Sequence, residues 1–481
     1  MNTLENALKY EASKVYTENG DTAFDTTRNA NLDFFASCGA LRYDREEVAK
    51  RTVRALVEDE DTAIRSIFRL RDARGGLGER DSFRTAFTAL YKRDPEKAVK
   101  LLPAIPEYGR WDDLFILLDE EPGRTAVISL VEKQLTEDME NAKAGKPVSL
   151  LAKWMPSINT SSEKTRKQAR ILKKGLGLTE KEYRTMLSAL REYIDILERR
   201  MSRKDYTFDY AKLPSKALMK HTKAFLRNDE ERYTAFKESL LQGDVAAKTA
   251  AVYPYEILRL EDEDLREAMW QNLERNVGDT KTIVVRDGSG SMTWSGFTGS
   301  SATPDDVATS LAILFSEQLT GAFKDKFITF SGRPQFVDLS ACGTLKDKVS
   351  VCRTYNDYTN TDILATYCLL LEAEKKCDPE DYIEKMVIIS DMQFDDGVTN
   401  VPTYDTAKAL FEKAGIPFPR IVYWNVASRA DFPSTDLENI RLVSGLSQYI
   451  IEGILKDDTP DALTYMYREL ERYDPVLELL K

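Results

Sequence analysis

The fold of the C-terminal part of this chain is decided by the stretch Lys281-Thr282-Ile283-Val284-Val285-Arg286-Asp287-Gly288-Ser289-Gly290-Ser291. Its first half is a short run rich in β-branched residues, which is typical of a strand buried on both faces. Its second half combines an aspartate with serines and glycines, a composition that favours a tight turn. Because open α/β sheets bind ligands at the carboxyl ends of their strands, the stretch predicts a strand that leads directly into a site.

The residues that follow alternate between apolar strands and amphipathic helices. Further strands are predicted at Lys326–Phe330, Gln335–Val337, Lys385–Ser390, Arg420–Val426 and Ile440–Ser444. Helices are predicted at Asp305–Gly321, Asp362–Lys376, Tyr404–Ala414, Ser447–Leu455 and, at the end of the chain, Pro460–Leu480. Apolar strands that alternate with helices indicate a mostly parallel, doubly wound sheet, so the fold class of this part is α/β and Rossmann-like.

The residues before the first strand read as one helix after another. Apolar residues recur there at spacings of three and four, for example in one long helix predicted over Thr179–Met201. Turn signals such as Arg74-Gly75-Gly76 separate the helices, and several pair into units of roughly 35–45 residues, the length of a HEAT-type repeat. No repeated consensus occurs. We therefore predict an α-solenoid over residues 1–277 and an α/β domain over residues 278–481 that includes the terminal helix.

Composition excludes several classes of protein. Hydrophobic residues make up 42% and charged residues 31% of the 481 residues, which excludes wholesale disorder. We expect no membrane span, because no stretch approaches the ~20 apolar residues that a spanning helix needs. The chain has five cysteines without C-x-x-C spacing and starts without a secretory signal, so we expect reduced thiols in a cytoplasm. Its single histidine, His221, nearly excludes a His-dependent triad or a multi-His metal centre.

Oxygen-bearing side chains gather at the predicted strand ends. Asp287, Ser289 and Ser291 follow the first strand, Thr361 stands directly before a helix, and Asp391 follows the strand Lys385–Ser390. Hydroxyl and carboxylate oxygens suit a hard divalent cation such as Mg²⁺, which keeps several waters in its coordination shell. The alternative is a glycine–serine turn with two helix N-caps, at Thr361 and Asp391. No candidate base stands beside a nucleophile, so the pattern favours binding and predicts that the protein is not an enzyme.

Residues from about 278 to 456 resemble a von Willebrand factor A (VWA) domain with a metal-ion-dependent adhesion site (MIDAS). The resemblance implies that Ser289, Ser291 and Thr361 ligate Mg²⁺ and that Asp287 and Asp391 bind it partly through water. Asn360 replaces the glycine that is usual beside the threonine. The free coordination position would then accept a carboxylate or another anionic oxygen from a partner.

Charge is distributed unevenly along the chain. The net charge is −12, yet residues 151–250 carry 22 basic and 13 acidic side chains. A basic block in an acidic protein is expected where one surface meets polyanions, although it can also be a set of solvated helix faces. The candidate RNA-binding residues are Arg71, Arg74, Lys153, Lys164, Arg166, Lys167, Arg170, Lys216, Lys220, His221, Lys223 and Arg227. Lys216, Lys220, Lys223 and Arg227 lie on one helical stripe, whereas Arg71 and Arg74 have an alternative role in salt bridges to Asp72, Glu79 or Asp81.

Several short motifs extend over nearly the whole chain. They are Arg69-Leu70-Arg71-Asp72-Ala73-Arg74-Gly75-Gly76-Leu77-Gly78-Glu79-Arg80, Tyr108-Gly109-Arg110-Trp111-Asp112-Asp113-Leu114, Leu151-Ala152-Lys153-Trp154-Met155-Pro156, Leu213-Pro214-Ser215-Lys216-Ala217, Val422-Tyr423-Trp424-Asn425-Val426 and Leu442-Val443-Ser444-Gly445. With these motifs the chain resembles the Ro ribonucleoprotein (TROVE) family, especially its bacterial, phage and plant relatives.

That resemblance implies a ring of HEAT-like helices that is clasped by the A-type domain. It also implies a non-enzymatic protein that holds single-stranded or structured small non-coding RNA, or misfolded RNA, and we expect the protein to be monomeric and cytoplasmic. The alternative function is a metal-dependent protein–protein interaction scaffold without RNA, in which the metal site captures an acidic protein ligand.

Overall fold

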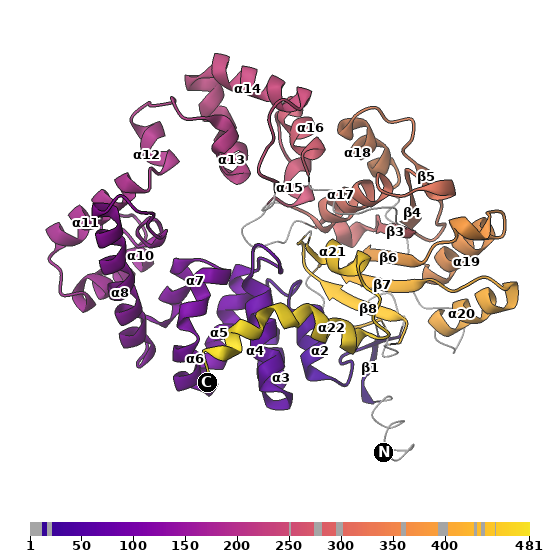
Figure 1. Ribbon diagram of the computed structural model, residues 1–481. Helices are drawn as coiled ribbons and strands as arrows, with labels where there is room; N and C mark the ends of the chain where they lie inside the picture. The colour runs from indigo at the N-terminus through magenta and orange to yellow at the C-terminus, as the bar shows by residue number, and fades with distance from the viewer. Residues whose placement is uncertain are drawn as a thin grey trace.

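A computed structural model of the chain describes residues 12–16, 22–249, 252–273, 281–294, 302–356, 362–392, 403–427, 431–433, 438–447 and 449–481. The ribbon follows a ring: helices form most of its circumference, and a six-stranded sheet with its helices completes it (Figure 1). A short hairpin, β1 (Lys14–Tyr16) with β2 (Thr22–Phe24), precedes the helices. The expected order of a helical part followed by an α/β part is confirmed.

Helices dominate the chain as far as residue 271. They are α2 (Ala30–Ser37), α3 (Arg45–Glu58), α4 (Glu60–Arg71), α5 (Arg80–Arg93), α6 (Pro95–Lys100), α7 (Ile105–Tyr108), α8 (Gly123–Lys143), α9 (Leu151–Trp154), α10 (Glu163–Gly175), α11 (Glu180–Tyr193), α12 (Leu197–Ser202), α13 (Ser215–Asn228), α14 (Glu230–Gln242), α15 (Pro254–Leu258) and α16 (Glu263–Gln271). Among the described residues, 3₁₀ turns also lie between these helices, including η1 (Leu102–Ala104), η2 (Trp111–Leu117) and η3 (Tyr210–Lys212).

Short polar caps explain how consecutive helices join. Asp59 ends α3, and its carboxylate accepts a hydrogen bond from the backbone N–H of Thr62 in the first turn of α4. The single helix predicted over Thr179–Met201 is wrong, because the chain breaks between α11 and α12 at Asp195, which has a φ of 57°. A left-handed residue at this point ends α11 and turns the chain into α12.

The α/β part is built on a sheet with the strand order β5-β4-β3-β6-β7-β8. The strands are β3 (Thr282–Asp287), β4 (Lys326–Phe330), β5 (Phe336–Asp338), β6 (Lys385–Ser390), β7 (Arg420–Asn425) and β8 (Ile440–Ser444). The helices are α17 (Pro304–Ser316), α18 (Leu345–Thr354), α19 (Ile363–Glu374), α20 (Thr403–Ala414), α21 (Tyr449–Leu455), α22 (Ala462–Leu470) and α23 (Asp474–Glu478), and the 3₁₀ turns are η5 (Gly290–Thr293), η6 (Gly321–Phe323), η7 (Pro379–Asp381) and η8 (Glu471–Tyr473).

All neighbouring strands in this sheet are parallel except β4 and β5, which pair antiparallel at one edge. β3, β6, β7 and β8 are almost completely buried, as their continuous apolar sequence predicts. From β3 the chain first adds strands on one side and then, with β6, on the other. The boundary between β3 and β6 is therefore the switch point of the fold, where a ligand site is expected.

The ring is closed by contacts between the sheet and the first helices. Gly39, just after α2, lies so close to the end of β8 that an added Cβ would stand 2.5 Å from the carbonyl oxygen of Ser444. Ser447 donates a buried hydrogen bond of 2.6 Å to the carbonyl of Gly76, and the hydroxyl of Tyr473 donates to Asp72 at 3.1 Å. The turn over residues 72–79 thus connects the helical part of the chain to its C-terminal residues.

The predicted terminal helix Pro460–Leu480 is wrong as one continuous helix, because it divides into α22, η8 and α23. α22 packs on β8 and also on α2 and α4, and α23 packs on α4. The terminal segment therefore bridges the α/β and helical parts, where the sequence placed it wholly in the α/β domain.

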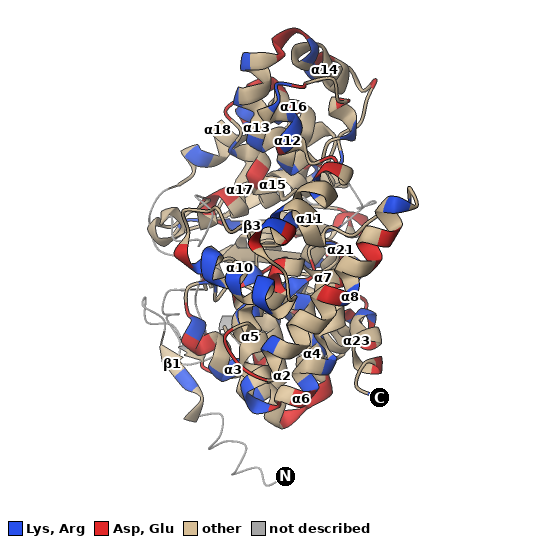
Figure 2. Cartoon of the chain, turned by 90° about the vertical axis from the view of Figure 1, so that its left-hand side faces the viewer, with Lys and Arg blue, Asp and Glu red and all other residues tan. Residues whose placement is uncertain are grey.

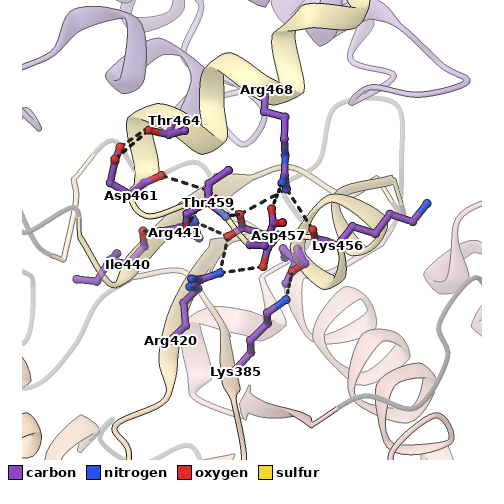
Figure 3. A network of polar contacts seen from close by, with 12 residues as sticks. Lys385, Arg420, Ile440, Arg441, Lys456, Asp457, Thr459, Asp461, Thr464 and Arg468 are labelled. Atoms are coloured by element: carbon purple, nitrogen blue, oxygen red, sulfur yellow. Dashed lines mark hydrogen bonds and ion pairs between the residues drawn. The ribbon is translucent and has the colours of Figure 1, made fainter.

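The linker between α21 and α22 is fixed to the sheet by one buried carboxylate, Asp457 (Figure 3). Asp457 accepts hydrogen bonds from Arg441 at 2.5 Å, from the hydroxyl of Thr459 at 2.6 Å and from Arg420 at 3.2 Å. Burial opposes ionisation, but the hydrogen bonds from Thr459 and the charge of Arg441 hold the pKa of Asp457 below its usual value. The network joins the linker to the amino-terminal ends of β7 and β8.

All five cysteines are free. Within the described ranges, no helix combines the length and hydropathy that crossing a bilayer requires.

Candidate metal site and basic surfaces

Parallel pairing brings two aspartates together at the switch point. β3 and β6 are in register from Thr282 opposite Lys385 to Arg286 opposite Ile389, so their carboxyl ends lie side by side. Asp287 is the last residue of β3, and Asp391 follows the last residue of β6. The predicted loops after these two strands therefore meet at one edge of the sheet.

Hydrogen bonds hold the first of these carboxylates in place. The hydroxyl of Ser390 donates to Oδ2 of Asp287 at 2.6 Å, and the backbone N–H of Ser289 donates to Oδ1 at 2.8 Å. The hydroxyl oxygens of Ser289 and Ser291 lie 3.1 Å apart. Four predicted ligand residues, Asp287, Ser289, Ser291 and Asp391, thus gather at this edge. The fifth, Thr361, lies outside the described residues.

The electrostatics of this edge suit a cation. Asp287 is completely buried and Asp391 almost so. Burial and, second, the negative charge of Asp391 raise the pKa of Asp287 to about 7. Two buried carboxylates that repel each other are stabilised by a positive ion between or beside them. The donor set is two carboxylates and two hydroxyls, and in the described part of the chain no three His, Cys, Asp or Glu side chains form a metal-binding group.

Arg286, the residue before Asp287, fixes the backbone next to the candidate site. Arg286 is fully buried, forms an ion pair with Asp305 and donates to the hydroxyl of Thr309 at 2.9 Å. Its guanidinium also donates to the side chain of Asn356 at 2.5 Å. Asn356 lies in turn against Gly288, where an added Cβ would stand 3.2 Å from its Oδ1. The turn after β3 is therefore held against the end of α18.

Sequence reasoning did not assign a role to Ser390 or Trp294. Ser390 is the last residue of the predicted strand Lys385–Ser390, and only its hydrogen bond to Asp287 reveals its role. Trp294 directly follows the turn η5, which contains Ser291, and 76% of its surface is exposed. A large aromatic side chain exposed next to a binding loop is a common feature of contact surfaces.

The predicted RNA-binding residues fall into three basic clusters along the chain, and the first, around the turn Arg74-Gly75-Gly76, is largely structural. Arg71 is buried, and its Nε donates to Asp113 at 2.6 Å, while Arg84 donates to the same carboxylate at 2.8 Å. The salt-bridge alternative therefore holds for Arg71, with Asp113 as partner in place of Asp72, Glu79 or Asp81. Because its side chain is inaccessible, Arg71 does not belong to a binding surface. Arg74 is exposed.

The second cluster forms an exposed face on α10. Ala169 and Leu172 bury one side of this helix, and the cations occupy the other side. Figure 2 looks onto α10 and shows basic residues along much of it. The members of this α10 face are Lys164, Arg166, Lys167, Arg170, Lys173 and Lys174.

Few of these cations are neutralised. Lys167 pairs with Asp119 at 2.7 Å, but both side chains are more than 60% exposed, so water and salt weaken the pair. Arg166 donates to the carbonyl of Thr160 at 3.3 Å. Lys153, predicted with this cluster, is exposed and lies 5.7 Å from the ring of Trp154. Trp154 is half-buried beneath Arg110, at 4.0 Å.

The third cluster, the α13 stripe, is partly neutralised. Lys216 pairs with Glu256 at 3.1 Å, and Lys223 pairs with Glu261 at 2.8 Å. Lys220 and Arg227 are exposed and make no ion pair with any described residue. His221 is half-buried, and burial followed by the charge of Lys220 lowers its pKa, so it is neutral at pH 7. Phe225 is fully buried, as expected for a core aromatic.

The three basic clusters do not form one site. α10 and α13 lie on separate arcs of the ring, and Arg71 lies inside a third (Figure 1). Of the predicted RNA-binding residues, the structure brings together those on α10 as one exposed surface. The α13 stripe is a second surface, with less unneutralised positive charge because Lys216 and Lys223 are paired with glutamates.

Comparisons with known proteins return mostly families without a described function. Residues 17–119 and 163–286 match the family model "Domain of unknown function (DUF2828)", and residues 281–473 match "Domain of unknown function (DUF7788)". A relative from Acanthamoeba polyphaga mimivirus, "Uncharacterized protein L728", is 28% identical over an alignment that covers 96% of this chain and 88% of that protein. The crystal structure of the Deinococcus radiodurans RO (RSR) protein superposes with a TM-score of 0.44 at 13% identity, over 93% of this chain and 100% of that one.

Proposed function

We propose that this protein is a non-enzymatic RNA-binding scaffold of the Ro type, in which a ring of HEAT-like helices holds RNA and a VWA-like domain completes the ring. The observation that carries the proposal is the α10 face. Lys164, Arg170 and Lys174 on this face are exposed and make no ion pair with any described residue. A row of unneutralised cations on one helix attracts a phosphate backbone and releases its counterions.

Fluorescence anisotropy with a labelled oligo(U) and a labelled RNA hairpin tests this proposal. In the wild-type protein we expect log Kd to rise linearly with log salt concentration. The variant R170E/K174E should bind at least about tenfold more weakly at 0.1 M salt, with a shallower salt slope, because each lost phosphate contact removes about 0.7 from the slope for a single strand.

The matched control is K376E/K413E, which reverses two exposed charges on the α/β part. It should bind RNA like the wild type and unfold at the same temperature as R170E/K174E. Binding that is absent in the wild type, or equal in both variants, contradicts the proposal.

We propose further that the edge formed by β3 and β6 binds Mg²⁺ as a MIDAS. Ser289, Ser291 and Thr361 would supply hydroxyl ligands, and Asp287 and Asp391 would supply carboxylates, directly or through water. What supports this is the buried, mutually repelling pair Asp287 and Asp391 beside two serine hydroxyls. With hydroxyls dominating the set, the ion would fix a partner's anionic oxygen without activating water for hydrolysis.

Thermal unfolding after dialysis against EDTA tests the metal site. Addition of MgCl₂ should raise the unfolding temperature of the wild type, since a ligand at a hundredfold excess over its Kd stabilises by about 2.7 kcal/mol. S289A/S291A should lose this stabilisation, whereas S340A, an exposed serine on the same domain, should keep it. A wild-type protein that responds to neither Mg²⁺ nor Mn²⁺ would exclude the site.

The second candidate function is a metal-dependent scaffold for an acidic protein ligand. It is favoured by Trp294, which is exposed directly after the turn η5 that contains Ser291. This function predicts a partner that copurifies with the protein, resists RNase and dissociates in EDTA. The RNA function predicts that RNase removes the copurifying material.

A further inference from the structure

A groove on the outside of the first helices is not explained by the proposed function. It lies between α3 and α5, has a volume of about 690 Å³, and is lined in addition by Ile116 and Lys164. We call its uncharged lining the floor, which consists of Ala49, Val53, Thr85, Thr88, Ala89 and Ile116. Val53 is 41% exposed, whereas Val48, Ala55 and Leu56 on the same helix are buried. We call this feature the α3–α5 groove.

The rim of the α3–α5 groove is positively charged. Arg45 stands at the start of α3, and Lys92 and Arg93 stand at the end of α5. All three are exposed and make no ion pair with any described residue. The acid on the rim is Asp81, which is already 3.9 Å from Arg80. The charge of the rim is therefore available to an anionic partner.

The chemistry of the floor decides which anionic partner fits. Among the described residues that line the groove, none is aromatic. Proteins that bind single strands of nucleic acid usually stack bases on aromatic rings, and this floor offers only short aliphatic groups and threonines. Aliphatic floors between two helices instead accept the Leu and Ile side chains of an amphipathic helix.

We propose that the α3–α5 groove docks an acidic amphipathic helix of a protein partner. The apolar face of that helix covers Val53 and Ile116, and its acidic flanks face Arg45 and Lys92. α3 and α5 have 14 residues each and are therefore about 21 Å long, so three to four turns of a partner helix match the groove. Lys164 of the α10 face also lines this groove, so the two proposals share one residue, and the variants that test the groove lie on α3 and α5.

A designed peptide provides the probe. It has 16 residues, repeats Leu-Glu-Glu-Leu at helical spacing and carries fluorescein, and its control is a scrambled peptide of the same composition without an apolar face. Anisotropy with the full chain should show binding at least tenfold tighter for the patterned peptide. V53D should weaken that binding at least tenfold, and R45E/K92E should weaken it and remove its salt dependence.

Two controls make the outcome decisive. K376E/K413E should leave peptide binding unchanged, and oligo(U) affinity should be the same in V53D and the wild type. The proposal is overturned if the patterned and scrambled peptides bind alike, or if V53D binds the peptide like the wild type. It is also overturned if the groove variants lower oligo(U) affinity and leave peptide affinity intact, since the groove would then be an RNA surface.

Discussion

At the scale of single residues, Glu374 is a buried carboxylate at the end of α19, and only one of its two oxygens accepts a hydrogen bond from a described residue. Its Oε1 accepts from the backbone N–H of Ile383 at 2.7 Å, and its Oε2 has no hydrogen-bond partner in the described part of the chain. Burial raises its pKa from 4.5 to about 7. The native state therefore keeps a proton that the unfolded state loses as the pH rises from 4.5 to 7, so this residue destabilises the fold above that window.

We expect E374Q to be more stable than the wild type at pH 8, by ~1–3 kcal/mol, because glutamine keeps the acceptor and never ionises. The difference should shrink as the pH falls through 7 and vanish below pH 4.5, where Glu374 is mostly protonated in both the folded and the unfolded wild type. Urea unfolding at several pH values measures it. E372Q, an exposed position on the same helix, should change stability by less than about 0.5 kcal/mol at pH 8. An E374Q variant that gains nothing at pH 8 contradicts the assignment.

How far single residues could be predicted depended on how local their partners are. Asp287, Ser289 and Ser291 lie within five positions, so their turn chemistry was readable from the sequence alone. The role of Arg71 was not, since its partner Asp113 is 42 positions away and only the packing of η2 against α5 and α7 brings the two together. From the sequence alone, a basic residue on a helix is expected at the surface, and only the structure shows that a distant acid pairs with it inside the core.

At the scale of elements, the strands were predicted more accurately than the helices. β4, β6 and β8 have the predicted ends, because each is an apolar run bounded by polar or turn residues. α18 was missed: its amphipathic pattern is interrupted by charged residues, and it begins at a capping box of Thr344 and Asp347 and packs on α16 and α17. The break at Asp195 was missed too, since neither glycine nor proline marks it.

At the scale of the whole molecule, closure of the ring was an expectation that only the family resemblance supplied. The contacts that close it join residues more than 370 positions apart, such as Ser447 with Gly76 and Tyr473 with Asp72. No local pattern encodes such pairs. In hindsight the glycines of the 69–80 motif were the signal, because Gly76 leaves room for Tyr473, whose hydroxyl would stand 2.9 Å from an added Cβ.

A substitution at Gly39 tests the closure of the ring, because the backbone of Gly39 lies directly against the backbone of Ser444. At Gly39 an added Cβ would stand 2.5 Å from the carbonyl oxygen of Ser444 and 2.8 Å from the side chain of Leu77, so G39V must push the end of β8 away from α2. We expect a loss of about 1–3 kcal/mol in unfolding free energy and a larger radius of gyration in small-angle X-ray scattering, as the α/β part separates from the first helices. G343V is the control, because an added Cβ there meets nothing within 4 Å. If G39V and G343V scatter and unfold alike, the contact between α2 and β8 does not hold the ring closed, and other contacts, such as those of Ser447 and of the segment α22–α23, must carry the closure.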